Sequence, residues 1–257
     1  MAALTLLAMA VAGGLVAVLW LTRAQRPAAD GPRWLTRTGG LGLIAVWVAL
    51  VPINVWSHRA GGHDLWIFGA ETFEGGLVET LTFIFYALAI AVCGLLFTRA
   101  SRLYGSASAS LWRVLLGVMV VCFVVMIGEE MSWGQHLLGF ETPADLAAVN
   151  LQGESNLHNL VSPRLYDVIY QVLGFALILL PPVAWFGLRG PNLPSPVLFL
   201  QGLYTGPWVY SLLASAGVLL QHEVFEELAE MVLAFAILYA LATLAVRTAR
   251  GTKPTSS

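Results

Sequence analysis

Seven apolar stretches divide this chain, and each would be long enough as an α-helix to cross the hydrocarbon core of a bilayer. A transmembrane α-helix needs about 20 mainly apolar residues, and lipid leaves room only for structures that satisfy every backbone hydrogen bond internally. We therefore predict an all-α polytopic integral membrane bundle of seven transmembrane helices. It forms one domain over residues 1–247, followed by a disordered tail at 248–257. The predicted helices cover roughly residues 3–22, 39–57, 77–98, 112–131, 166–187, 197–219 and 228–246.

The composition excludes an ordinary soluble domain. Only 11% of the residues are charged and 58% are hydrophobic, whereas a soluble domain carries about 25% charged residues. The two cysteines, Cys93 and Cys122, lie inside apolar stretches and provide neither a disulfide framework nor a metal-binding Cys pair. No loop is basic and aromatic enough to indicate nucleic-acid binding.

The charges of the chain are sorted between alternate loops. Of the 13 Lys and Arg residues, all but Arg59 and Arg164 lie on one side of the apolar stretches. All five His residues and nearly all Asp and Glu residues lie on the other side. Because Lys and Arg concentrate in cytoplasmic loops, we predict that the N-terminus is outside and the C-terminus is cytoplasmic. In a bacterium, this corresponds to the inner membrane, with the functional face directed outward into the periplasm.

The longest outer loop, residues 132–165, is too apolar to be a simple turn. It contains Trp133, Phe140 and several leucines, and long loops in compact proteins are usually functional or disordered. We predict that it forms a lid or a re-entrant segment. Within the spans, Pro181 and Pro182 are expected to kink or break the fifth helix, and Pro207 the sixth.

The sequence GEEMSWGQHLLGFE places two acids at the outer end of the fourth span. If the helix continues past Glu130, then Glu129 and His136 lie two turns apart on one face, with Ser132 between them. Adjacent carboxylates after an apolar run are costly unless they are paired, metal-bound or hydrated. We predict that Glu129, Glu130 and Ser132 are catalytic and that His136 is a metal ligand. The alternative is a hydrated helix end with Trp133 in the interfacial aromatic belt.

A second group, QHEVFEELAE, precedes the seventh span. At helical spacing, His222 and Glu226 share a face, and Glu230 leads directly into the apolar run. These three residues are predicted metal ligands. A solvated helix start is an equally good interpretation, because acids are favourable near the N-terminus of a helix dipole.

Three further residues are weaker candidates. Glu154 and His158 are four residues apart in the amide-rich segment NLQGESNLHNL, where a hydrogen-bonded structural role is favoured. Glu79 is the deepest acid of the segment ETFEGGLVET and enters the third span near its first turn.

Convergence of these helix ends would create a site with several acids, two imidazoles and few cations. Protonation or a divalent metal would relieve the excess negative charge, and mixed imidazole and carboxylate ligands suit Zn, Fe or Mn. The metal-binding patterns H-E-x-x-H and E-x-x-H are absent from the chain. We predict a metal-dependent hydrolase or transferase that acts on a lipid or lipid-linked substrate at the outer face.

Two other functions remain open at this point. An acidic outer vestibule also suits a cation or proton transporter, although the inner halves of the spans contain few polar residues. A non-catalytic membrane assembly subunit could instead use the same acids to bind a basic partner protein.

Overall fold

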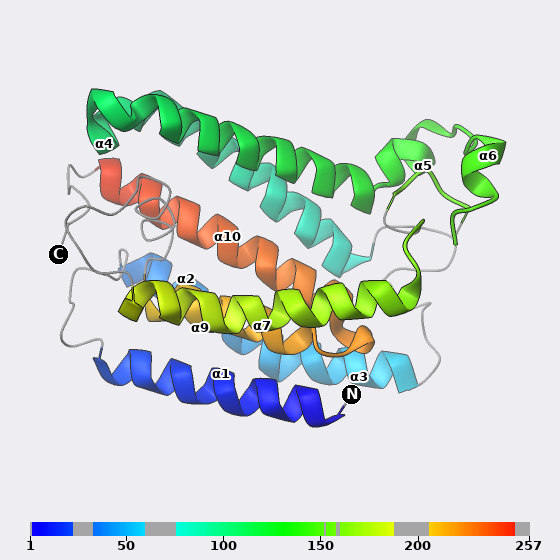
Figure 1. Cartoon of the computed structure of the whole chain (residues 1–257), viewed down its shortest axis with the longest axis horizontal. Coiled ribbons are helices and arrows are strands. Elements are labelled where there is room, and N and C mark those ends of the chain that lie inside the picture. The colour runs from blue at the N-terminus through cyan, green and yellow to red at the C-terminus, as the bar shows by residue number, and fades with distance from the viewer. Residues whose placement is uncertain are drawn as a thin grey trace.

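The computed structural model describes residues 2–22, 33–59, 76–151, 153–157, 160–187 and 206–249, and all regular structure in these ranges is helical (Figure 1). The predicted all-α class is confirmed. The elements are α1 (Ala2–Thr22), α2 (Arg33–Ala45), the π-helical turn η3 (Val46–Leu50), α3 (Val51–Arg59), α4 (Leu77–Glu130), η4 (Ser132–Gly134), α5 (Gln135–Leu138), α6 (Ala144–Ala147), α7 (Pro163–Gly187), α9 (Pro207–Leu219), η6 (Glu223–Phe225) and α10 (Glu226–Ala249).

Within the described residues, five helices are long and apolar enough to cross a membrane. They cover Arg33–Ser57, Leu77–Ser101, Ala109–Glu130, Arg164–Val183 and Glu223–Ala249. Two shorter apolar helices, Leu6–Val18 and Pro207–Leu219, fall within the first and sixth predicted spans. These helices indicate a membrane protein. The start of the sixth predicted span and residues 250–257 of the predicted tail lie outside the described residues, whereas α10 continues to Ala249.

The helix α4 folds back on itself, so its two halves pack as an antiparallel pair. The ring of Tyr86 stacks on Phe123 with 5.5 Å between centroids, and the guanidinium of Arg113 lies 5.8 Å from the ring of Phe97. A straight helix would separate Tyr86 and Phe123 by about 55 Å. The chain therefore reverses between Ser101 and Ala109, which returns its C-terminal end to the level of its start.

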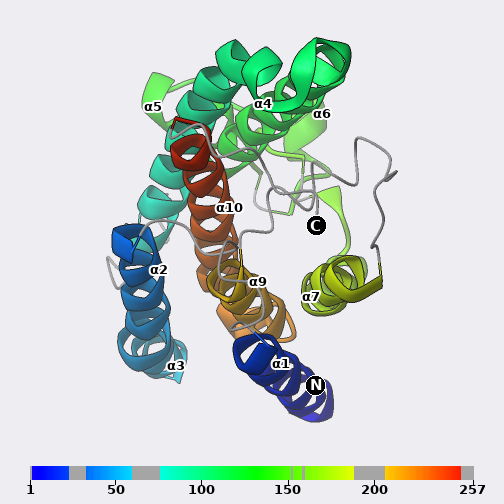
Figure 2. The same cartoon turned by 90° about the vertical axis from the view of Figure 1, so that its left-hand side faces the viewer.

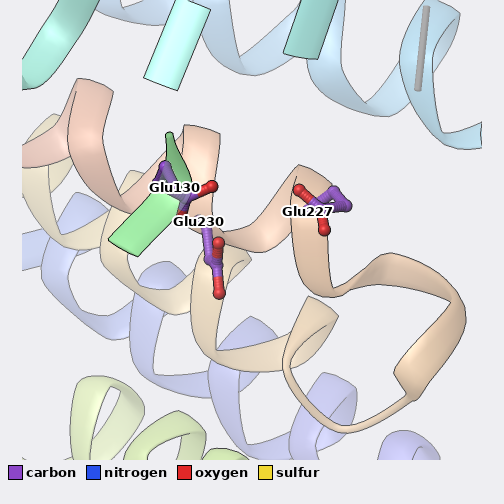
Figure 3. Close-up of side chains that lie close together, drawn as sticks. All are labelled: Glu130, Glu227 and Glu230. Carbon is purple, nitrogen blue, oxygen red and sulfur yellow. The ribbon is translucent and has the colours of Figure 1, made fainter. Parts of the chain in front are cut away.

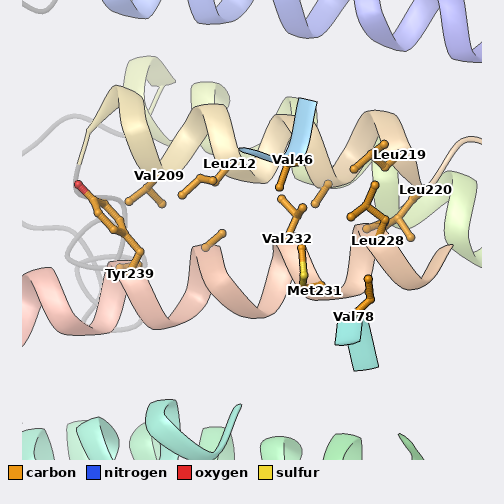
Figure 4. Packing of buried hydrophobic residues seen from close by; sticks show 14 of the residues in the cluster. Val46, Val78, Val209, Leu212, Leu219, Leu220, Leu228, Met231, Val232 and Tyr239 are labelled. Atoms are coloured by element: carbon orange, nitrogen blue, oxygen red, sulfur yellow. The ribbon is translucent and has the colours of Figure 1, made fainter. Parts of the chain in front are cut away.

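The helix α10 is the central element of the bundle (Figure 2). Its membrane-length window is 61% buried, compared with 17–28% for the other four. It packs against α4, α9 and α2. One apolar cluster joins Leu228 and Val232 of α10 to Leu212 of α9, Val46 of η3 and Val78 of α4 (Figure 4). This core fixes the start of α4 next to the start of α10.

The prolines act differently in the two helices. The helix α7 continues through Pro181 and Pro182 to Gly187, so it is not broken at these residues. The sixth predicted span is interrupted at Pro207, as expected, because Gly206 has a φ of 130° and α9 begins at Pro207. At this first helical position the missing N–H of proline leaves no intrahelical bond unmade.

The helices α7 and α9 cross closely where two glycines meet. A Cβ atom at Gly174 would lie 2.6 Å from the carbonyl oxygen of Gly217, and one at Gly217 would lie 2.5 Å from the carbonyl oxygen of Gly174. Small residues allow this backbone approach between membrane helices. The crossing holds α7 beside α9 and sets the position of its N-terminal tyrosines.

The sorted charges occupy opposite ends of the described bundle. Arg247 lies in the last turn of α10. The helix α2 runs antiparallel to α10, since Gly39 lies beneath Tyr239 and Gly42 beneath Phe235. The basic end therefore contains the start of α2, the turn of α4 and the last turn of α10, with Arg33, Arg37, Arg99, Arg113 and Arg247. The acidic end contains the start of α4, its C-terminus and the start of α10 (Figure 1).

Candidate functional site

Three carboxylates from two helices converge at the acidic end of the bundle (Figure 3). Glu130 is the last residue of α4, and Glu227 and Glu230 lie in the first two turns of α10. One oxygen atom of each lies within 4.8 Å of one oxygen atom of each of the others. Glu227 and Glu230 are three residues apart and so share a helix face. We refer to these three residues as the carboxylate cluster.

The charges of the cluster oppose one another. Glu130 and Glu230 are both half-buried, and one carboxylate oxygen of each lies within 4.8 Å of one oxygen of the other. Two ionised carboxylates 4.8 Å apart repel by about 3 kcal/mol at an effective dielectric constant near 20. Glu79 lies close enough to interact electrostatically with both Glu130 and Glu227. This repulsion favours a shared proton or a bound cation in the cluster.

The helix α7 adds two tyrosines to one side of the cluster. The hydroxyl of Tyr170 donates to an oxygen of Glu230, and the hydroxyls of Tyr166 and Tyr170 are hydrogen-bonded to each other. Because each hydroxyl has one proton, Tyr166 is then the donor to Tyr170. The two rings lie 4.3 Å apart between centroids, as expected for residues one helical turn apart. The result is a chain of hydroxyl groups that ends at Glu230.

The donor set and spacing of the cluster fit a hard divalent cation. Oxygen ligands bind Mg²⁺ at about 2.0–2.1 Å and Ca²⁺ at about 2.3–2.6 Å, so donors on opposite sides of one ion are about 4–5 Å apart. The cluster atoms lie within 4.8 Å of one another. Its ligands are carboxylates alone, which suit Mg, Mn or Ca. The predicted preference for Zn or Fe relied on His136, whose side chain the structure does not describe, and on His222, which is not among the described residues of this group.

The hypothesis that the fourth helix continues past Glu130 was wrong. The helix ends there because Ser132, Trp133 and Gly134 adopt left-handed backbone angles, with φ of 44°, 55° and 81°. His136 belongs to the separate short helix α5, so it is not two helical turns from Glu129 on one face. The side chain of His136 lies outside the described part of the structure.

The break directs Glu129 and Glu130 into different surroundings. Glu129 accepts hydrogen bonds from the indole N–H of Trp133 at 2.7 Å and from the backbone N–H of Leu157 at 2.7 Å. It thereby joins the end of α4 to the distant end of the outer loop. Glu130 instead belongs to the carboxylate cluster.

Ser132 and Glu154 meet inside the folded outer loop. We call residues 131–157 the cap; the structure describes all of them but residue 152 and the side chains of residues 136 and 137. The hydroxyl of Ser132 donates to Oε2 of Glu154 at 2.8 Å, and the amide of Asn156 donates to the same oxygen at 2.8 Å. Asn150 donates to the carbonyl and side-chain oxygens of Asn156 at 2.8 and 3.0 Å. Ser132 is fully buried, which indicates a structural contribution.

The helical pairing expected for His222 and Glu226 does not form. His222 is extended, with φ of −149° and ψ of 125°, and its Nδ1 accepts from the backbone N–H of Val224 at 3.3 Å. The short 3₁₀ turn η6 separates it from α10, which begins at Glu226. Glu226 is half-buried and interacts electrostatically with Glu230 and Asp167. His158 lies outside the described residues.

The structure thus brings together two of the predicted residues, Glu130 and Glu230, with Glu79 nearby. Glu227, Tyr166 and Tyr170 were not predicted as site residues from the sequence. Glu227 could have been predicted, because its three-residue spacing from Glu230 places both on one helix face. Tyr166 and Tyr170 could not have been predicted, because their contact with Glu230 depends on how α7 crosses α9.

Comparisons with protein-family models, curated proteins and solved structures give no match for this chain.

Proposed function

We propose that this protein is a membrane-embedded, metal-dependent hydrolase or transferase that acts on a lipid or lipid-linked substrate. One observation carries the proposal: Glu130, Glu227 and Glu230 converge from two helices at one end of an apolar bundle. Acidic groups at this depth are costly and are usually functional. The substrate class follows from the location, since the bilayer supplies substrates to a site at a helix end.

The proposed cofactor is Mn²⁺ or Mg²⁺. Both prefer oxygen ligands, and Mg²⁺ is usually held by few carboxylates together with water and substrate oxygens. Such an ion would polarise a phosphoryl or carbonyl oxygen and activate water at neutral pH. The residues that would hold it are Glu130, Glu227 and Glu230.

Other residues near the cluster have proposed roles that follow from their contacts. Glu226 is half-buried and interacts electrostatically with Glu230, so it is the proposed general base. Tyr170 donates to Glu230 and orients its carboxylate. Glu129 and Ser132 are engaged in the cap and are assigned structural roles here instead of the predicted catalytic ones.

The proposed topology has seven spans, with the N-terminus outside and the C-terminus in the cytoplasm. The five helices of membrane length and the two shorter apolar helices together support this count. The basic end of the bundle is assigned to the cytoplasm by the positive-inside rule. In a bacterium, the carboxylate cluster then faces the periplasmic side of the inner membrane.

A second candidate function is cation or proton transport, favoured by the hydrogen-bonded chain Tyr166–Tyr170–Glu230. It ranks lower because the core between α4 and α10 toward the basic end is apolar, with Leu116, Leu241 and Leu244. The hydroxyls of Ser211 and Ser215 in α9 bond to carbonyls of their own helix.

The test of the enzymatic proposal uses the full chain in proteoliposomes that contain a panel of phospholipids and polyprenyl diphosphates. Mass spectrometry would detect released headgroups or phosphate with Mn²⁺, with Mg²⁺ and with a chelator. We expect turnover that requires the ion and is lost in Glu130→Gln and Glu230→Gln. The matched control is Glu141→Gln, which changes an exposed cap acid.

Three outcomes would contradict the proposal. Turnover that persists with the chelator would show that the reaction does not depend on a metal ion. Ion-dependent uptake of protons or cations by the vesicles, without any lipid product, would favour the transporter. Absence of ion binding, turnover and flux would favour the assembly subunit.

A further inference from the structure

The cap has a polar interior and an apolar exterior. Of its described residues, only Ser132, Asn150 and Asn156 are buried, and all three are polar. Several of its large apolar side chains are strongly exposed, with exposed fractions of 73% for Leu138 and 64% for Leu151. In a water-soluble unit, the apolar side chains would be inside and the amides outside.

The polar interior is well satisfied, so the outward placement of the apolar residues is not a packing failure. The Oε1 atom of Gln135 accepts from the hydroxyl of Thr142 at 3.0 Å and from the backbone N–H of Ser155 at 2.8 Å. The backbone N–H of Glu154 donates to Oδ1 of Asn150 at 3.1 Å. These bonds cross the cap from end to end and hold its apolar side chains in fixed outward positions.

The apolar exterior continues a stripe on the membrane-length part of α4. That stripe consists of exposed valines at helical spacing: Val114, Val118, Val121 and Val125. Gly128 is the next position, and it is covered by the ring of Trp133, because a Cβ there would lie 2.9 Å from that ring. Trp133 therefore links the lipid-facing stripe of α4 to the cap.

A similar apolar surface begins where the cap ends. Leu165, Val168 and Val172 on the first turns of α7 are exposed. The cap is thus bounded on both sides by helix faces that contact lipid in a membrane. Two acids, Glu141 and Asp145, are also exposed on the cap, one before α6 and one within its first turn. A segment that exposes both apolar side chains and acids suits the boundary between headgroups and acyl chains.

We propose that the cap is an interfacial element whose apolar side chains lie among the bilayer lipids on the acidic side of the membrane. The side chains that contact lipid are those of Trp133, Leu138, Phe140, Val149, Leu151 and Leu157. The occupant of this surface is phospholipid because the surface is continuous with the lipid-facing stripe of α4. This inference rests on the membrane location of the helices and needs no bound cation.

The test places an environment-sensitive fluorophore at single cysteines in the full chain, reconstituted in phosphatidylcholine vesicles. Leu138→Cys and Leu151→Cys are the test sites, in a chain carrying Cys93→Ala and Cys122→Ala. Asp145→Cys is the matched water-facing control within the cap. The chain labelled at its native Cys122, which is exposed on α4, gives the pattern of a lipid-facing position.

We expect the labels at positions 138 and 151 to be quenched by spin-labelled lipid near the headgroup and protected from aqueous iodide. The label at position 145 should show the reverse. Iodide quenching at positions 138 and 151 would overturn the proposal, since the cap would then lie in water. Protection from both quenchers would also overturn it, because a protein or a second copy of this chain would then cover the surface. The same quenching measurement is repeated in the Glu130→Gln variant, which removes a residue of the proposed metal site. The quenching at positions 138 and 151 is expected to be unchanged, so failure of the metal proposal and failure of this one can be distinguished.

Discussion

Glu129 and Glu130 are adjacent in the chain but belong to two polar centres of different character. Glu129 faces donors, since an indole N–H and a backbone N–H each bond to one of its oxygens. Glu130 faces other acids, namely Glu227 and Glu230. A carboxylate that faces donors stabilises a fold, whereas carboxylates that face one another require a proton or a cation. The contrast separates a structural centre in the cap from a candidate functional centre in the bundle.

The largest effect is expected in the structural centre. Glu154→Ala leaves the buried donors of Ser132 and Asn156 without their shared acceptor, and each unsatisfied buried group costs about 1–3 kcal/mol. We expect the cap to lose about 2–4 kcal/mol of stability. Limited proteolysis of the cap in detergent measures this loss. Glu141→Ala is the control and should change stability by about 0.5 kcal/mol or less.

The opposite response is expected in the carboxylate cluster. Glu130→Gln removes one of three repelling charges, so thermal stability without added cation should be unchanged or higher. Its affinity for Mn²⁺ should fall at least about tenfold, which corresponds to about 1.4 kcal/mol. Calorimetric titration in detergent measures the affinity. A strongly destabilised variant with unaltered affinity would contradict the distinction between the two centres.

The effect of pH sharpens the same contrast. Protons compete with a cation for the carboxylates, so binding releases protons. Cation affinity should therefore be greatest at high pH and fall as the pH is lowered, by up to about tenfold per pH unit for each proton released. A pH-indicator dye during the titration counts these protons. Binding without proton release would show that the cluster is already fully ionised.

The smallest effect is expected from Tyr170→Phe. This substitution removes the hydroxyl that donates to Glu230 and leaves the ring in place. A single hydrogen bond of this kind contributes about 0.5–1.5 kcal/mol, so the cation affinity should change by about two- to tenfold. Tyr210→Phe is a matched control, since its hydroxyl bonds to the carbonyl of Ile178 away from the cluster. An equal effect of both variants on cation affinity would show that the Tyr170 hydroxyl makes no specific contribution to the site.

The helical class and the acidic helix ends could be predicted from the sequence, because long apolar runs and sorted charges act through general membrane physics. The acids at the helix ends could therefore be predicted as site candidates, and these include Glu79, Glu130 and Glu230. The choice of Glu227 over Glu226 could not be made, because it depends on where α10 begins after the 3₁₀ turn at Glu223–Phe225.

The different surroundings of Glu129 and Glu130 could also not be predicted from the sequence. It depends on positive φ angles at Ser132 and Trp133, which residues with a Cβ rarely adopt. The conformation is held by tertiary contacts, including the ring of Trp133 on Gly128 and the bond from Ser132 to Glu154.

The most direct measurement is Mn²⁺ binding, followed by electron paramagnetic resonance, for the wild-type chain, Glu129→Gln and Glu130→Gln in detergent. The account predicts stoichiometric binding by the wild-type chain and by Glu129→Gln, and loss of binding in Glu130→Gln alone. Equal loss in both variants, or no binding by the wild-type chain, would contradict the central claim that only Glu130 belongs to a cation-binding centre.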